Sequence, residues 1–127
     1  MPHGLIGFET CRHWVLLSTD DDSQVAWLQA VALPNVAIPV VSPKRYFPNY
    51  RAHVLKRDLT SLHLHSEDLI YFLCVVSKSG SALTANLKSP ILLNATRHLA
   101  IQVVVTDDQP LALPLGLTES RTVKRAA

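Results

Sequence analysis

Short runs of apolar residues, separated by polar or proline-containing turns, recur along the whole chain. The runs are rich in Val, Ile, Leu and aromatic residues, which is typical of β-strands. The predicted strands are residues 13–17, 25–31, 36–41, 69–76, 82–87, 90–93 and 99–105. About seven short strands with frequent turns predict a mainly β, antiparallel sandwich or barrel. We expect the second form, a small antiparallel barrel-like domain with one or two short helices.

The apolar run at residues 69–76 is the strongest strand signal and predicts a central strand. Pro39 restricts strand 36–41 to an edge or irregular position, and Pro114 interrupts a further apolar stretch at 111–117. Leucines at 55, 59 and 62 have helical spacing and predict a short helix over residues 56–64. The predicted core comprises Trp27, Leu28, Ile70, Phe72, Cys74, Val76, Ile101 and Val103.

The uncharged stretch at residues 23–43 is about long enough to span a bilayer as a helix. Pro34 and Pro39 argue against that helix, and two strands joined at residues 33–35 explain the same sequence. The N-terminus lacks the pattern of a signal peptide. With no membrane segment predicted and only 2 cysteines, the expected location is the cytoplasm.

At 127 residues, with 48% hydrophobic and 17% charged residues, the chain fits one globular domain. We assign residues 1–117 to that domain and residues 118–127 to a polar, basic, disordered tail that is dispensable for folding. The formal net charge is only +2, a weak excess compared with typical nucleic-acid-binding surfaces.

Motifs for catalysis or cofactor binding are absent from the sequence, which contains no GxSxG, GxGxxG or GxxxxGK[ST] pattern. His63 and His65 are the only close histidine pair, and a zinc site needs three or four ligands. Cys74 lies in an apolar run and predicts core packing, which leaves Cys11 as the better candidate for a reactive thiol. We expect no enzyme activity, no cofactor and no metal.

The aromatic loop around Tyr46, Phe47 and Tyr50 is flanked by Lys44 and by the arginines at 45 and 51. Three interpretations remain open: a structural cap on the barrel, a protein-binding patch, or a platform that stacks RNA bases.

Six segments, read in order, resemble the FliW family. They are GLIGFE at 4–9, WLQ at 27–29, PNVA at 34–37, the proline-aromatic loop at 43–50, TANL with PI at 84–91, and QVV at 102–104. Each segment alone is weakly specific, but their colinear order covers nearly the whole chain.

The resemblance implies a cytoplasmic flagellar assembly factor that binds flagellin and also binds CsrA, an RNA-binding translational repressor. Flagellin would compete with CsrA for binding to this protein. Secretion of flagellin would then free the protein to antagonise CsrA. The candidate partner-binding residues are Tyr46, Phe47, Tyr50 and Asn86. The aromatic residues could serve as exposed anchors, and Asn86 could read a partner's backbone or fix a turn. The alternative function is a small β-barrel that binds single-stranded RNA directly, and the oligomeric state stays open.

Two features depart from the family pattern. The resemblance implies opening strands upstream of residue 4, so either the start is misassigned or the chain is shortened, and an unpaired sheet edge is expected. Family members are typically acidic, whereas this chain is slightly basic. Antagonism of CsrA is therefore expected to depend on shape and conformation, or on local acidic clusters such as residues 20–22 and 107–108.

Overall fold

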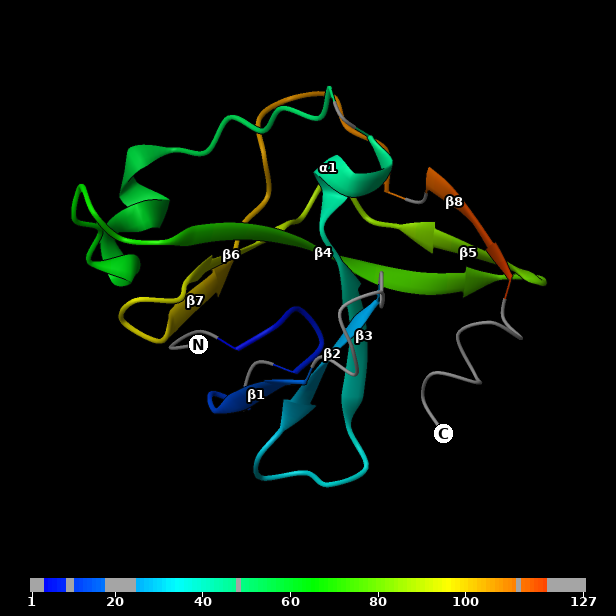
Figure 1. The fold of residues 1–127 in the computed structure, drawn as a ribbon, viewed down its shortest axis with the longest axis horizontal. Helices are drawn as coiled ribbons and strands as arrows, with labels where there is room; N and C mark the ends of the chain where they lie inside the picture. The colour runs from blue at the N-terminus through cyan, green and yellow to red at the C-terminus, as the bar shows by residue number, and fades with distance from the viewer. Residues whose placement is uncertain (1–3, 9–10, 18–24, 48, 112, 119–127) are drawn as a thin grey trace.

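Strand β4 (Ile70–Ser79) organises the computed structural model, which describes residues 4–8, 11–17, 25–47, 49–111 and 113–118. Its residues pair in succession with β6 (Ile91–Asn94), β3 (Ala37–Val41) and β5 (Ala82–Ala85). Figure 1 shows β4 crossing the middle of the molecule, with these three strands leaving it in different directions. The predicted central strand is confirmed.

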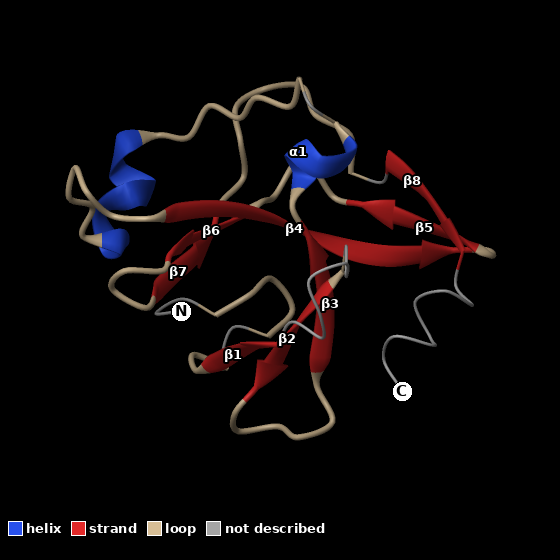
Figure 2. Cartoon of the chain, viewed as in Figure 1, coloured by secondary structure: helices blue, strands red, loops and turns tan. Residues whose placement is uncertain are grey.

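The other strands extend the sheet outward from these three. β1 (Trp14–Leu17) and β2 (Ala26–Ala30) continue beyond β3, β7 (Leu99–Gln102) pairs with β6, and β8 (Leu113–Thr118) pairs with β5. All of these pairings are antiparallel, which confirms the mainly β, antiparallel prediction (Figure 2). The strand pairs that the structure describes form an open sheet that branches at β4, and do not close it into a barrel.

The apolar character of β4 arises because both of its faces are covered. Phe72, Cys74 and Val76 point toward core clusters that include residues of β3, β5 and β7. Leu73 and Val75 point to the opposite side and pack against a cluster formed by Leu5, Leu28, Val40 and Ile91.

Two short helices occur in the described chain. A 3₁₀ helix, η1 (Lys56–Leu62), stands where a short helix was predicted and ends at His63, whose φ of 47° is left-handed. Helix α1 (Pro43–Tyr46) was not predicted as a helix. It begins with Pro43 after Ser42, a combination that favours a helix start because proline fixes φ and needs no amide partner there.

The predicted core is largely correct. Leu28, Cys74, Val76, Ile101 and Val103 are buried. Trp27 and Phe72 are half-buried. The prediction that Ile70 belongs to the core is wrong. Ile70 is 36% exposed, because it begins β4 at the end of the sheet.

Two of the prolines singled out in the sequence, Pro39 and Pro114, lie within strands. Pro39 pairs with Trp27 of β2, and the β3–β4 ladder begins only at Val40, so the missing proline amide costs no bond there. Pro114 lies in β8, a strand that the interrupted pattern failed to predict; β8 is the last strand of the sheet path.

Most of the predicted tail, residues 119–127, lies outside the described residues, and Thr118 ends β8. In the ranges given above, neither helix has the length and apolar character required to cross a membrane.

Candidate functional site

The predicted aromatic anchors Tyr46, Phe47 and Tyr50 lie in and just after α1, in unequal environments. Tyr50 is only 6% exposed, and its hydroxyl donates a hydrogen bond of 2.9 Å to the carbonyl oxygen of Leu87. Burial raises the pKa of Tyr50 well above its ordinary value. The expectation that Tyr50 is an exposed anchor is therefore wrong. Tyr46 and Phe47 are half-buried, with ring centroids 6.4 Å apart, so each ring can offer only part of its surface to a partner.

Asn86 fixes a turn, which is one of the two roles considered for it. Its side-chain oxygen accepts hydrogen bonds from the backbone amides of Lys88 at 3.0 Å and Ser89 at 3.1 Å. The backbone amide of Asn86 donates a hydrogen bond to the carbonyl oxygen of Val75 on β4. These bonds occupy the oxygen of the Asn86 side chain within the chain itself, and any contact with a partner would have to use the remaining side-chain nitrogen.

Gln102 joins segments that are distant in the sequence. Its Oε1 accepts a hydrogen bond of 2.8 Å from the amide of Ile6, and its Nε2 donates one of 3.1 Å to the carbonyl oxygen of Ser89. Ile6 lies in a tight turn in which Gly7 adopts a φ of 91°, a conformation that favours glycine. Three of the segments that resemble FliW therefore meet in one hydrogen-bonded framework.

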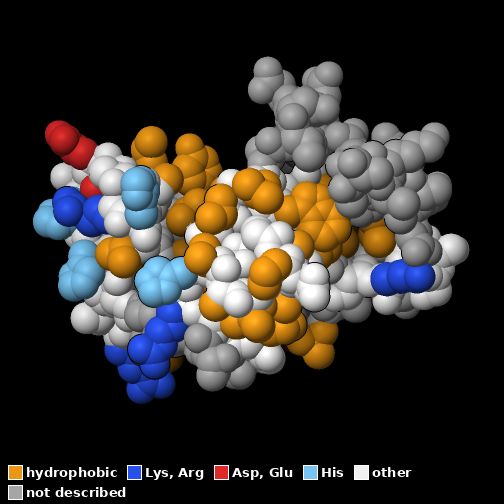
Figure 3. Space-filling view, turned by 90° about the horizontal axis from the view of Figure 1, so that it is seen from below, with side chains coloured by type: hydrophobic (Ala, Val, Ile, Leu, Met, Phe, Trp, Pro, Cys, Tyr) orange, Lys and Arg blue, Asp and Glu red, His pale blue; other side chains and the backbone are white. Residues whose placement is uncertain are grey.

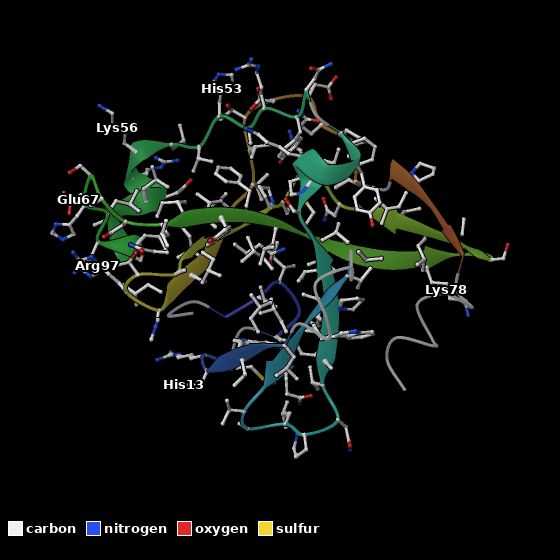
Figure 4. All side chains as sticks on the ribbon, in the orientation of Figure 1. His13, His53, Lys56, Glu67, Lys78 and Arg97 are labelled. Carbon is white, nitrogen blue, oxygen red and sulfur yellow. The ribbon has the colours of Figure 1, made fainter. Side chains whose placement is uncertain are left out.

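A groove of about 460 Å³ lies between the α1 region and the first half of β4. We call it the basic groove, and it is lined by Ser42, Pro43, Lys44, Tyr50, Arg51, Ala52, His53, Ile70, Tyr71, Phe72 and Leu73. Among these, Tyr71 is 50% exposed. It was not among the site residues predicted from the sequence. Lys44, Arg51 and His53 line the same groove, and none of the lining residues is acidic. Figure 4 shows His53 on the segment that passes above β4.

A second groove, the apolar groove, has a volume of about 470 Å³ and lies beside β1. It is lined by Trp14, Val15, Leu16, Leu28, Leu73, Ile91, Leu93, Ala95, His98 and Ala100. Figure 3 shows hydrophobic side chains gathered on the face seen from below, the side on which Figure 1 places β1, β2 and β3. The basic groove and the apolar groove therefore differ in chemical character, and their linings share only Leu73.

A polar cluster fastens the β6–β7 turn to the segment that follows η1. Asn94, which is fully buried, donates from Nδ2 to the carbonyl oxygen of Leu62 and to Oδ2 of Asp68. The same Asp68 oxygen accepts hydrogen bonds from the His65 amide and from Nε of Arg97. The hydrogen bond from Asn94, with those from His65 and Arg97, holds the pKa of Asp68 below its ordinary value and outweighs the opposing effect of burial.

This cluster predicts a loss of stability in acid. A carboxylate with a depressed folded-state pKa stabilises the fold above its unfolded pKa of about 3.9, and that contribution is lost as pH falls through the lower folded value. We expect the free energy of unfolding to decrease below about pH 4, and the Asp68→Asn variant to show a shallower decrease. Urea unfolding as a function of pH measures both. Identical acid limbs for the two proteins would show that Asp68 makes no such contribution.

The histidine pair and the two cysteines are the remaining candidate residues from the sequence. His63 and His65 are exposed, and no cluster of three or more His, Cys, Asp or Glu side chains suited to a metal ion occurs in the part of the chain that the structure describes. Burial raises the pKa of Cys74 to about 12, which keeps its thiol protonated. Cys11, the better candidate for a reactive thiol in the sequence, is buried as well.

The sequence model of one protein family, described as FliW protein, matches residues 1–115. The chain belongs to the FliW family. The fold agrees with this assignment: a solved structure titled "Crystal structure of the flagellar assembly factor FliW" superposes with a TM-score of 0.83 at 26% identity, covering 92% of this chain and 84% of the other.

Curated FliW relatives show the same similarity. The flagellar assembly factor FliW of Bdellovibrio bacteriovorus is 36% identical over 107 residues, which are 83% of this chain and 61% of that relative. The flagellar assembly factor FliW 2 of Desulfotalea psychrophila is 29% identical over 84% of this chain and 72% of its own length. This chain therefore spans less than two thirds of the Bdellovibrio protein.

Proposed function

We propose that this protein is a flagellar assembly factor that binds flagellin and antagonises the translational regulator CsrA through protein–protein contacts. Its membership of the FliW family supports the assembly role, because its curated relatives carry the name flagellar assembly factor. A role as a binding protein without enzyme activity agrees with that name. Flagellin and CsrA are the partners that the family resemblance implies.

The surface of the molecule supports a protein-binding role. Two grooves of roughly equal volume expose apolar side chains, including Tyr71 in one and Val15 and Leu16 in the other. Exposed apolar surface of this kind, placed next to polar groups, is typical of sites that bind other proteins. Two grooves that share only Leu73 would allow flagellin and CsrA to bind at surfaces that do not coincide.

Direct RNA binding through the aromatic loop has less support. Base stacking needs aromatic rings that are open on one face. Tyr50 is buried and Tyr46 and Phe47 are half-buried, so the loop presents little stacking surface. A protein-binding module should have no appreciable RNA affinity of its own, whereas direct phosphate contacts would give an affinity that falls steeply with salt.

A competition assay tests the proposal. Labelled CsrA from the same genome is titrated with this protein, and flagellin is then added. We expect the protein to bind CsrA and flagellin to reduce that binding. CsrA binding that flagellin leaves unchanged would reject the switch. Salt-dependent binding of single-stranded RNA to the protein alone would favour the RNA-binding alternative.

A further inference from the structure

The basic groove combines an apolar floor with a cationic rim. Its floor includes Ile70 and Tyr71 at the start of β4, which are 36% and 50% exposed. The segments at 42–44 and 50–53 form its walls. Large apolar side chains that are open to water in a concave site favour an occupant that removes them from water.

The charge of the rim is unbalanced. Lys44 and Arg51 are exposed, and within the described ranges neither side chain forms an ion pair. His53 differs, because its ring nitrogen and its backbone amide both contact the carboxylate of Asp107. Two free cations beside a low-dielectric apolar floor create a positive potential in the groove. An occupant with carboxylates would complement that potential, and one with further cations would be repelled.

The wall at residues 50–53 is held in place before any partner arrives. Nε2 of Gln109 donates to the carbonyl oxygen of Arg51 at 2.9 Å, and the amide of Thr106 donates to that of His53 at 3.2 Å. The carbonyl oxygen of Asp107 in turn accepts a hydrogen bond from Nζ of Lys88. A groove that is already formed loses little conformational entropy when it is filled.

We propose that the basic groove binds a protein segment that combines apolar side chains with carboxylates. The inference rests on the proposed function, which makes the partner a protein and supplies the two candidates. An RNA-binding regulator is expected to present a basic surface, which the rim would repel. Of the two proposed partners, flagellin therefore occupies this groove, and CsrA binds elsewhere.

Labelled peptides test the chemistry of the groove without either natural partner. The peptides share one alternating apolar frame and carry Glu, Gln or Lys at the intervening positions. Fluorescence anisotropy should show the wild-type protein binding the Glu peptide most tightly and the Lys peptide least. In the double variant Lys44→Glu/Arg51→Glu, the Glu peptide should bind about tenfold more weakly at low salt, since each surface ion pair contributes modestly.

The matched control is Lys56→Glu/Arg57→Glu, which makes the same change of charge on exposed residues of η1 outside the groove lining. It should bind the peptides as the wild type does. Equal affinity of the wild type for the Glu and Lys peptides, or no binding of any peptide, would overturn the inference.

Flagellin binding, measured with the same variants, separates this inference from the proposed function. A loss of flagellin binding in the Lys44→Glu/Arg51→Glu variant, but not in the control, supports both. Flagellin binding that is unaffected in the groove variant rejects the groove and leaves the proposed function standing. Wild-type protein that prefers the Glu peptide but does not bind flagellin rejects the proposed partner and leaves the groove.

Discussion

Replacing Tyr50 with alanine should lower the free energy of unfolding by about 3–5 kcal/mol, the usual cost of deleting a buried aromatic side chain. Tyr50 packs in the core cluster that contains Val41, Cys74 and Leu87. The Tyr50→Phe variant isolates the hydroxyl, and it should cost about 1–2 kcal/mol because it leaves the Leu87 carbonyl without its donor. Chemical denaturation of the two variants measures both effects.

The exposed Tyr71 is the matched control for Tyr50. Tyr71→Ala should cost less than about 1 kcal/mol, because half of that side chain is already in water. We expect the Tyr71 variant to remain folded and to bind flagellin more weakly, and the Tyr50 variant to lose binding only to the extent that it unfolds. A Tyr50→Ala protein that is as stable as the wild type but no longer binds would restore Tyr50 as a direct anchor.

Asn94→Ala should lower the free energy of unfolding by about 2–3 kcal/mol, because it leaves buried polar groups without partners. Asn94 is fully buried and donates to the carbonyl oxygen of Leu62 at 3.0 Å and to Asp68 at 2.9 Å. The control is Arg97→Ala. The Arg97 side chain is 39% exposed, and without it Asp68 keeps its hydrogen bonds from Asn94 and His65, so we expect a smaller cost than for Asn94→Ala.

Urea unfolding at neutral pH compares these two variants. If Asn94→Ala lowered the free energy of unfolding no more than Arg97→Ala does, Asn94 would not be the residue that fastens the β6–β7 turn to the segment after η1.

The strands were predictable where one simple pattern dominated. The run at 69–76 became β4 because both of its faces are covered, and the segments at 25–31 and 36–41 became β2 and β3. The pattern failed where geometry depends on pairing partners. Pro114 interrupts the apolar pattern of β8, so this strand was not predicted, although β8 tolerates a proline because it is the last strand of the sheet path. The branching of the sheet at β4 cannot be predicted from the periodicity of apolar residues.

The candidate site was only partly predictable for a related reason. The sequence could not show that Tyr50, in the aromatic loop, faces the core while Tyr71, in a strand, faces water. The family-like residues Asn86 and Gln102 proved to hold the framework together. The bonds of Asn86 to Lys88 and Ser89 are local, and fixing a turn was one of its two predicted roles. The bonds of Gln102 to Ile6 and Ser89 join residues far apart in the chain, and local sequence carries no signal for them.

Calorimetric titration of this protein with flagellin from the same genome measures whether the two proteins bind. We expect saturable binding with a dissociation constant of about 1 μM or lower, as is usual for a specific protein interface. The Lys44→Glu/Arg51→Glu variant should bind more weakly, and the Lys56→Glu/Arg57→Glu variant should bind as the wild type does. A folded wild-type protein that shows no heat of binding by titration at several temperatures, and no complex with flagellin on a sizing column, would contradict the account.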